Sequence, residues 1–244
     1  MLVKVGGTEC DIRVEAVMSM PRLGFNDNWF GWAQALMPLG IRPTKMTGAF
    51  WGQCLQRVCE QFVDSCEYLL TIDYDTFFTK QDVEQLMAMA MTFQCDAITG
   101  LQTKREDGRP MLTLKGMLDN PPEDGKTSLP MSWFAEPVQE VDSAHFGCTV
   151  ISTAALKRTP KPWFLGVPNA DGEWGAGRTD DDIFFWKQFR KAGNRVYVTP
   201  RVVLGHGEYV VSWPGKDLGK PVFQYSTDFC NTSKKPETAW SVPE

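Results

Sequence analysis

Two aspartates one residue apart, Asp73 and Asp75, follow the apolar run Leu69–Ile72. Their negative charges repel each other, and partial burial strengthens the repulsion unless a cation, a proton or a strong hydrogen-bond donor compensates it. Alternate residues after an extended strand point to the same side, so both carboxylates could reach one ion. Carboxylate oxygens are the ligands that Mg²⁺ and Mn²⁺ prefer, and such ions keep phosphate and water in the rest of their shell. The pair could merely cap the next turn, but we favour a site for a divalent metal and a diphosphate.

A second acidic cluster, Asp180–Asp182, opens an aromatic segment with helical spacing. Thr179 and Asp182 have the spacing of a capping box, and acids in a first helical turn are favoured by the helix dipole. Three consecutive aspartates nevertheless exceed what capping needs, so Asp181 or Asp182 could act as a general base toward an alcohol. The spacing leaves the structural and the catalytic interpretation both open.

The sequence contains two histidines. His206 stands between two glycines at the end of an expected strand, where close backbone approach suits a ligand to a metal already held by aspartate oxygens. His145 is expected to pack in the core or to contact substrate. Three aromatic residues fall in expected loops and could stack on the apolar face of a sugar: Trp163, Phe164 and Trp174.

Alternating strand and helix patterns must position these side chains. Apolar runs predict strands at residues 14–20, 68–72 and 97–101. Helical spacing predicts helices at residues 29–37, 50–65 and 79–91. The third helix opens with a capping box formed by Thr79 and Asp82. This rhythm predicts an α/β fold with a parallel sheet covered by helices, whose ligands collect at the carboxyl ends of the strands.

The second half of the chain is less regular. The patterns predict an edge strand at 111–117, a proline-rich loop at 118–137, two strand pieces within 138–152, a helix at 180–192 and further strands at 195–200 and 202–207. We expect one domain over residues 1–207, with a donor half at about 14–101 and an acceptor half at about 102–207. Residues 208–244 show no strong periodicity and are expected to form a C-terminal tail that packs over the active site.

Composition limits the classes of function. A chain of 244 residues that is 43% hydrophobic and 12% aromatic can bury a sizeable core. Its formal charge of -5 gives no general basic field for nucleic acid or an anionic membrane. Charged residues interrupt the first twenty positions, no later segment is long and apolar enough to span a membrane, and we expect a cytoplasmic protein. The seven cysteines include no C-x-x-C pair, so neither a disulfide framework nor a zinc site is expected.

The order of the motifs resembles the GT-A fold glycosyltransferases, especially glycosyltransferase family two. The similarity runs from about Val14 to Tyr209 and consists of "TIDYD", "HFGCTVIS", "PWF", "DDIFFWKQFRKAGNRVYVTPRV" and "LGHGE", in that order. It implies a GT-A, Rossmann-like fold: a mixed, mostly parallel sheet flanked by helices, with a loop-rich acceptor side.

The resemblance also implies roles for individual residues on the donor side. Asp73 and Asp75 match the D-x-D motif, with Tyr74 between them, that holds Mn²⁺ or Mg²⁺ and the diphosphate of a nucleotide-sugar. His206 matches the histidine that completes the metal shell. The residues that match donor-binding positions are Ser19, Pro21 and Arg22 for the nucleoside, and Gly147 and Cys148 for the floor beneath the sugar.

On the acceptor side, Asp181 and Asp182 match the Glu-Asp pair of the family, whose aspartate is the usual base. Asp182 is therefore favoured, although Asp181 stands where glutamate is commoner and leaves the choice open. The implied reaction is transfer of a sugar from a nucleoside diphosphate sugar, commonly a uridine one, to an acceptor hydroxyl. Inversion in one step is expected, and retention is the alternative.

The acceptor is open at this point: a glycan is favoured, and a hydroxyl on a modified nucleic-acid base is compatible. The latter needs basic residues gathered on one face, and the candidates are Lys104, Arg105, Arg109, Lys157, Arg158, Lys161, Lys187, Arg190 and Lys191. A nucleotidyltransferase and a non-catalytic carbohydrate-binding module are the alternative classes. The first would be expected to have a glycine-rich, basic phosphate loop near its start, and the second would need neither acidic cluster.

Overall fold

The structure is a computed structural model of the whole chain, and it divides into two compact units, Met1–His206 and Gly207–Glu244. It describes residues 1–21, 24–105, 108–119, 129–216 and 220–240. No helix in these ranges is both long enough and apolar enough to cross a bilayer.

A central eight-stranded sheet organises the first unit, in the order β4-β3-β5-β10-β7-β11-β9-β8. The strands are β3 (Val14–Met20), β4 (Pro43–Thr47), β5 (Tyr68–Ile72), β7 (Ala97–Leu101), β8 (Leu112–Leu114), β9 (Gln139–Ala144), β10 (Cys148–Ser152) and β11 (Val196–Val203). β3 is parallel to β4 and β5, β7 is parallel to β11, and β10 runs antiparallel to both β5 and β7. β3, β4, β5, β7 and β11 therefore share one direction. Their carboxyl ends meet at one edge of the sheet, where ligands of α/β proteins bind.

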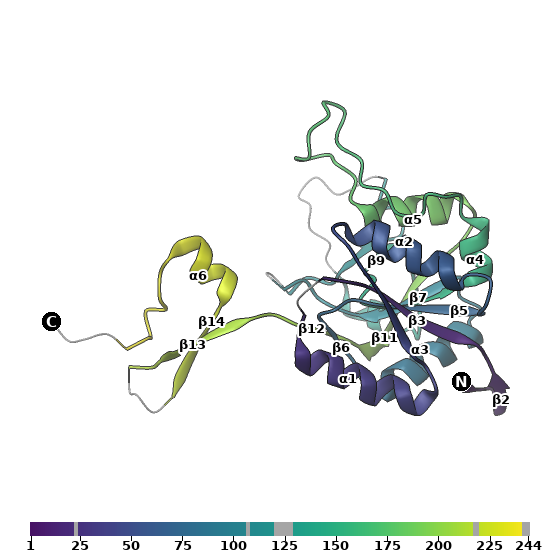
Figure 1. The fold of residues 1–244 in the computed structure, drawn as a ribbon, viewed down its shortest axis with the longest axis horizontal. Coiled ribbons are helices and arrows are strands. Elements are labelled where there is room, and N and C mark those ends of the chain that lie inside the picture. The colour runs from purple at the N-terminus through teal and green to yellow at the C-terminus, as the bar shows by residue number, and fades with distance from the viewer. Residues whose placement is uncertain (22–23, 106–107, 120–128, 217–219, 241–244) are drawn as a thin grey trace. The chain divides into compact units, whose positions relative to one another are not determined.

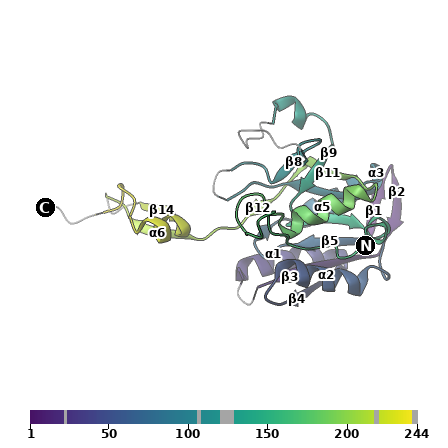
Figure 2. The ribbon, with the colours of Figure 1, turned by 90° about the horizontal axis from the view of Figure 1, so that it is seen from above.

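Helices cover both faces of this sheet. They are α1 (Asn26–Leu36), α2 (Trp51–Phe62), α3 (Lys80–Thr92), α4 (Thr153–Arg158) and α5 (Asp181–Lys191). Figure 1 shows α2, α4 and α5 on one side and α1 and α3 on the other. Figure 2, turned by 90°, shows β3 and β4 at one edge of the sheet and β8 and β9 at the other.

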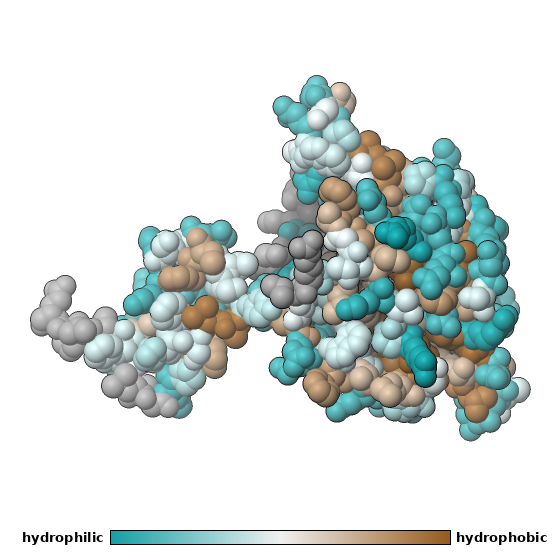
Figure 3. Space-filling view, in the orientation of Figure 1, coloured by the Kyte–Doolittle hydropathy of each residue, from teal (hydrophilic) through white to brown (hydrophobic). Residues whose placement is uncertain are grey.

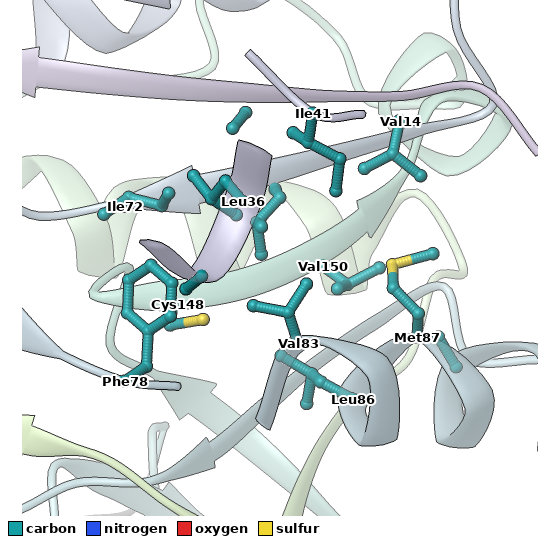
Figure 4. Close-up of a cluster of buried hydrophobic side chains, with 14 of the residues drawn as sticks. Val14, Leu36, Ile41, Ile72, Phe78, Val83, Leu86, Met87, Cys148 and Val150 are labelled. Carbon is teal, nitrogen blue, oxygen red and sulfur yellow. The ribbon is translucent and has the colours of Figure 1, made fainter. Parts of the chain in front are cut away.

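The core consists of two apolar clusters, one on each face of the sheet. Strand β5 supplies both, because successive side chains of a strand point to opposite faces. Leu70 and Ile72 pack with residues of α1 and α3, as Figure 4 shows for Ile72, whereas Leu69 joins the cluster under α2 and α5. On the face seen in Figure 3, hydrophilic and hydrophobic residues are interspersed over the surface of this unit.

Most predicted elements are present with small shifts of their ends. The Thr79–Asp82 capping box is confirmed, because Thr79 Oγ1 accepts from the Asp82 N–H and the Asp82 carboxylate accepts from the Thr79 N–H. Some elements were not predicted: the hairpin β1 (Leu2–Val5) and β2 (Thr8–Asp11), strand β4, helix α4 and strand β6 (Thr76–Phe77). The short strand β12 (Gly205–His206), which pairs with β6, lies within the strand predicted at residues 202–207.

The second unit is built around an antiparallel hairpin. Strands β13 (Val210–Pro214) and β14 (Pro221–Tyr225) precede the short helix α6 (Ser226–Thr232), and Trp213 packs its ring against Phe229 of that helix. The sequence patterns did not predict these elements. The expected packing of residues 208–244 over the active site stays a prediction.

Candidate active site

The two aspartates of the D-x-D motif lie directly after β5. Asp75 is only 4% exposed, whereas Asp73 is partly exposed. The Asp73 N–H donates to the Gly147 carbonyl at 3.0 Å, which joins the end of β5 to the start of β10. Trp51, the first residue of α2, donates its indole N–H to Asp73 Oδ1 at 3.1 Å. The first aspartate is therefore held by two neighbouring elements.

Strand pairing brings His206 to the second aspartate. Antiparallel β12 places His206 opposite Thr76 of β6, and His206 Nε2 lies 3.6 Å from Asp75 Oδ2. His206 Nδ1 lies 2.8 Å from the Thr103 carbonyl oxygen. Because a carbonyl only accepts, Nδ1 carries the proton, and in the neutral ring the lone pair of Nε2 faces Asp75.

The Arg105 guanidinium and the His206 imidazole both face the second aspartate of this pair. Asp75 is flanked by His206 and by the Arg105 guanidinium, whose Nη2 lies 3.5 Å from Asp75 Oδ2. The Asp75 carboxylate accepts a hydrogen bond from protonated His206 Nε2, and this raises the pKa of His206. Burial, opposed by the hydrogen bond from Trp51 and reinforced by repulsion from Asp75, raises the pKa of Asp73 to about 6. The repulsion between the two aspartates that was inferred from the sequence is thus present, and it contributes to the raised pKa of Asp73.

The donor chemistry suits a divalent metal. Two carboxylates and an imidazole Nε2, with its other nitrogen fixed by a carbonyl, form a ligand set that Mn²⁺ or Mg²⁺ accepts. Within the described residues, no group of three His, Cys, Asp or Glu side chains is gathered closely enough to hold an ion by protein atoms alone. Ions of this kind usually retain water and substrate phosphate oxygens, so a partial protein shell fits them.

The second acidic cluster lies at the start of α5, but not as a capping box. Asp180 is the N-cap residue, without a side-chain cap bond, and its carboxylate instead pairs with Arg178. Thr179 pairs its backbone with Val167 in an isolated bridge. The predicted Thr179–Asp182 capping box is therefore wrong: Asp182 Oδ1 accepts instead from the Ile183 N–H at 2.8 Å. Burial raises the pKa of Asp182.

A cavity of about 400 Å³, which we name the acidic cleft, joins the two clusters. Its lining residues are Trp51, Asp73, Met111, His145, Phe146, Gly166, Trp174, Asp180, Asp181 and Asp182. A smaller hollow of about 280 Å³ shares Met111, His145, Asp180 and Asp182 with it and is lined in addition by Lys104. The fold thus brings Asp73 into one cleft with Asp181 and Asp182, which lie far from it in the sequence.

Asp181 sits between two glycines that leave room for its carboxylate. A Cβ on Gly166 would lie 2.8 Å from Asp181 Oδ1, and a Cβ on Gly52 would overlap the same carboxylate and lie 2.9 Å from Phe164 Cβ. Asp181 therefore packs against the first turn of α2. Both of its oxygens are confined by these two glycines.

Gly52→Ala is expected to destabilise the protein, although alanine is the better helix former by about 1 kcal/mol. The added methyl group must displace Asp181 or Phe164, and overpacking of this kind costs about 1 to 3 kcal/mol. Urea denaturation of both variants checks this, with Gly31→Ala in α1 as the matched control. Nothing lies within 4 Å of a Cβ at Gly31, so that variant is expected to gain stability. Equal behaviour of the two variants would contradict the packing of Asp181.

The other predicted donor-binding residues fall at the same edge of the sheet. Ser19 is buried near the end of β3, and Pro21 is exposed just beyond it. Arg22 lies outside the described residues. Tyr74 is half-buried, with its ring stacked on Phe25 at 6.1 Å.

Gly147 and Cys148 start β10 beside Asp73. A Cβ on Gly147 would lie 2.5 Å from Thr76 Oγ1 and 2.9 Å from Gln102 Oε1, so only glycine fits there. The Cys148 side chain is fully buried in an apolar cluster, and burial raises its thiol pKa. Cys148 therefore lies beneath the edge of the sheet.

Sequence reasoning missed Trp51, which was predicted only as an apolar helix position. Its ring contacts Phe146 and Phe164 edge-on, each at 5.5 Å, while its N–H reaches Asp73. The expectation that Trp163 and Phe164 are exposed sugar platforms is wrong, because they are 2% and 5% exposed in the core under α2 and α5. The sequence pattern predicted a loop at these residues, but it could not show that this loop folds back onto the sheet and buries both rings.

His145 is buried in a hydrogen-bond network beside the cleft. The Gly147 N–H donates to His145 Nδ1 at 3.0 Å, so Nε2 carries the proton and donates to the Gly100 carbonyl at 3.1 Å. Thr99 Oγ1 also lies 3.1 Å from Nε2 and donates to the Cys148 carbonyl at 2.8 Å. Protonation of Nδ1 would break the bond to Gly147, and burial lowers the pKa of His145 from 6.5 to about 4.

Acid is therefore expected to remove stability contributed by His145. Because its folded-state pKa lies below the ordinary value, this contribution is complete above about pH 6.5 and is lost toward about pH 4, amounting to about 3 kcal/mol. Asp73, whose pKa is raised, has the opposite effect in an overlapping range. The measurement is the difference in unfolding free energy between wild type and His145→Gln from about pH 7 to about pH 4. It should shrink by about 3 kcal/mol, and a constant difference would contradict the neutral buried ring.

Comparison with known proteins supports the fold. No protein-family model matches the sequence, and neither does any curated protein. The crystal structure of A197 from STIV aligns with a TM-score of 0.50 and 14% identity, over 81% of this chain and 95% of that chain. S. aureus TarS 1-349 in complex with UDP-GlcNAc gives 0.49 and 13%, over 81% of this chain and 59% of that one. GalNAc-T7 with UDP, GalNAc and Mn²⁺ gives 0.47 and 9%, over 80% and 44%.

The chain thus spans less than two thirds of the TarS and GalNAc-T7 chains. The fold predicted from the motif order is confirmed: this is a GT-A fold, with a mixed sheet flanked by helices, in which β3, β4, β5, β7 and β11 share one direction.

Proposed function

We propose that the protein is a metal-dependent glycosyltransferase that moves a sugar from a nucleoside diphosphate sugar, specifically a UDP-sugar, to an acceptor hydroxyl with inversion. The observation that carries this proposal is the acidic cleft, in which Asp73 of the D-x-D motif and Asp182 of the second cluster line one cavity beside the carboxyl ends of the parallel strands. Transfer of a sugar from a nucleoside diphosphate to a hydroxyl needs a group that binds the diphosphate and a base that accepts the hydroxyl proton, and the two must lie side by side.

Asp73, Asp75 and His206 would hold Mn²⁺ or Mg²⁺. When bound, the ion stabilises the negative charge that develops on the leaving diphosphate. Trp51 keeps Asp73 in place, and Thr103 keeps the His206 ring in the orientation that exposes Nε2 toward Asp75. Ser19, Pro21, Arg22 and Tyr74 would contact the nucleotide, and Gly147 and Cys148 would underlie the sugar.

Asp182 is the base in this proposal. It accepts the proton of the acceptor hydroxyl as that oxygen attacks the anomeric carbon from the side opposite the diphosphate. One carboxylate oxygen is oriented by the Ile183 N–H, and a pKa raised by burial makes the group a stronger base. Asp181 is less suited because its carboxylate packs against Gly52 and Gly166.

Nucleotide release from a panel of nucleoside diphosphate sugars, with Mn²⁺, with Mg²⁺ and with chelator, tests the proposal. Metal-dependent release from one donor class would support it, and the anomeric configuration of the transferred sugar separates inversion from retention. Pyrophosphate release from a nucleoside triphosphate would favour a nucleotidyltransferase instead. Failure of every nucleotide to bind, with saccharide binding retained, would favour a carbohydrate-binding module.

A further inference from the structure

We propose that the acceptor is a neutral saccharide whose ring stacks on Trp174 in the acidic cleft. This inference rests on the proposed function and adds the chemical class of the second substrate. Three observations carry it: a loop that holds an exposed indole in place, a second aromatic wall, and a cleft lined by acids.

The loop that carries Trp174 is fixed by hydrogen bonds and leaves the side chain of Trp174 exposed. The side chain is 62% exposed, yet it lines the cleft, and its ring lies about 3.2 Å from the position of a Cβ on Gly166. Val167 and Thr179 close the loop with two backbone hydrogen bonds of 2.8 Å. Figure 1 shows this loop, in green, projecting from the unit just before α5.

Inside the loop, one side chain organises the turn that carries the tryptophan. Asn169 Oδ1 accepts from the N–H groups of Asp171 and Glu173, and Asn169 Nδ2 donates to the Ala176 carbonyl at 3.0 Å. The Arg178 guanidinium lies within 3.4 Å of the Trp174 carbonyl oxygen. These hydrogen bonds fix the backbone of the loop that carries Trp174. An exposed indole on a fixed loop indicates a contact surface, because it offers a large area at low conformational cost.

Aromatic groups also form the inner wall of the cleft. Trp51 and Phe146 line it, and their edge-on contact fixes both rings. A cavity of about 400 Å³ with apolar walls and a few oriented carboxylates fits a small ring-shaped, hydroxyl-bearing group. The C–H face of a sugar would lie on the indoles while its hydroxyls meet the aspartates.

The charge of the cleft disfavours an anionic acceptor. Its described lining includes Asp73, Asp180, Asp181 and Asp182 but no lysine or arginine. The adjacent Arg178 is engaged by Asp180 at 2.7 Å, and Lys104 lines only the neighbouring hollow. A phosphate or carboxylate on the acceptor would be repelled here.

Four of the nine basic residues that a nucleic-acid acceptor could use are paired with acids elsewhere. The pairs are Lys157–Asp64, Arg158–Asp96, Lys161–Glu60 and Arg190–Asp142, all with N···O distances of 2.9 Å or less. Their positive charge is therefore compensated locally, which favours the glycan over the modified nucleic-acid base.

The test measures donor turnover with and without candidate acceptors. The donor and metal that give nucleotide release are incubated with neutral oligosaccharides of glucose, galactose and N-acetylglucosamine, with uronate-containing oligosaccharides, and with an oligonucleotide bearing hydroxymethylated bases. Variants Trp174→Ala and Trp174→Phe are compared with Phe30→Ala, a control in α1 whose side chain is equally exposed, at 62%.

We expect a neutral saccharide to accelerate turnover with formation of a glycosylated product. Trp174→Ala should lower kcat/KM for that acceptor about 10-fold, while Trp174→Phe retains most of the activity and Phe30→Ala all of it. Acceleration by the oligonucleotide or the uronate oligosaccharides alone, or an unchanged kcat/KM in Trp174→Ala, would overturn the acceptor proposal. Absence of release and of transfer with every donor would instead overturn the proposed function, and saccharide binding measured by titration calorimetry on wild type and Trp174→Ala would then decide the role of Trp174.

Discussion

Asp182→Asn is expected to lower the rate of sugar transfer by about 10²- to 10⁴-fold, the usual contribution of a general base. The amide is isosteric and can still accept from the Ile183 N–H, so the start of α5 should keep its geometry. It cannot take the proton of the acceptor hydroxyl. Donor affinity, measured by titration calorimetry with the nucleotide and metal, should stay near the wild-type value, whereas kcat for transfer falls.

Asp181→Asn is the matched control for this experiment, because the two aspartates are adjacent in the first turn of α5. Its effect on transfer should be much smaller if Asp182 is the base. A large loss in Asp181→Asn together with retained transfer in Asp182→Asn would move the base to Asp181. A parallel loss of donor affinity in Asp182→Asn would show that its role is not confined to the acceptor side.

Asp75→Ala is expected to abolish metal-dependent nucleotide release, with a loss of at least about 10³-fold, because metal stabilisation of transition-state charge is worth several kcal/mol. The substitution removes one carboxylate of the ligand set and leaves His206 without the group that raises its pKa. The measurements are Mn²⁺ affinity by calorimetry and nucleotide release with added metal or chelator.

The fold should survive this change, because removal of Asp75 relieves its repulsion of Asp73. Circular dichroism and thermal unfolding provide the check, and Asp75→Asn serves as a second variant that preserves side-chain volume. His206→Ala should weaken metal affinity to a smaller extent and leave the fold intact. Release by Asp75→Asn at the wild-type rate with chelator present would contradict a metal site at the D-x-D motif.

The local sequence pattern was sufficient to predict the strand that ends at the D-x-D aspartates and the helix start that follows it. Strand β5 could be predicted at its observed ends, because a short apolar run followed by polar residues describes a buried strand at any position in a fold. The capping box at Thr79 could be predicted as well, since both of its hydrogen bonds join residues three apart. The same local rule failed at Thr179, where a backbone bridge to Val167 and the ion pair between Arg178 and Asp180 replaced the cap.

By itself, the sequence determined the α/β rhythm and the two acidic clusters with His206 as candidate ligand. Only the tertiary structure decided that Asp73 and Asp182 line one cleft, that Trp51 donates to Asp73, and that Trp163 and Phe164 are buried while Trp174 is exposed. The physical reason is the range of the interactions. Helix spacing, strand alternation and caps depend on residues a few positions apart, whereas these contacts join segments whose distance is set by the order of strands in the sheet and by the path of the loop before α5.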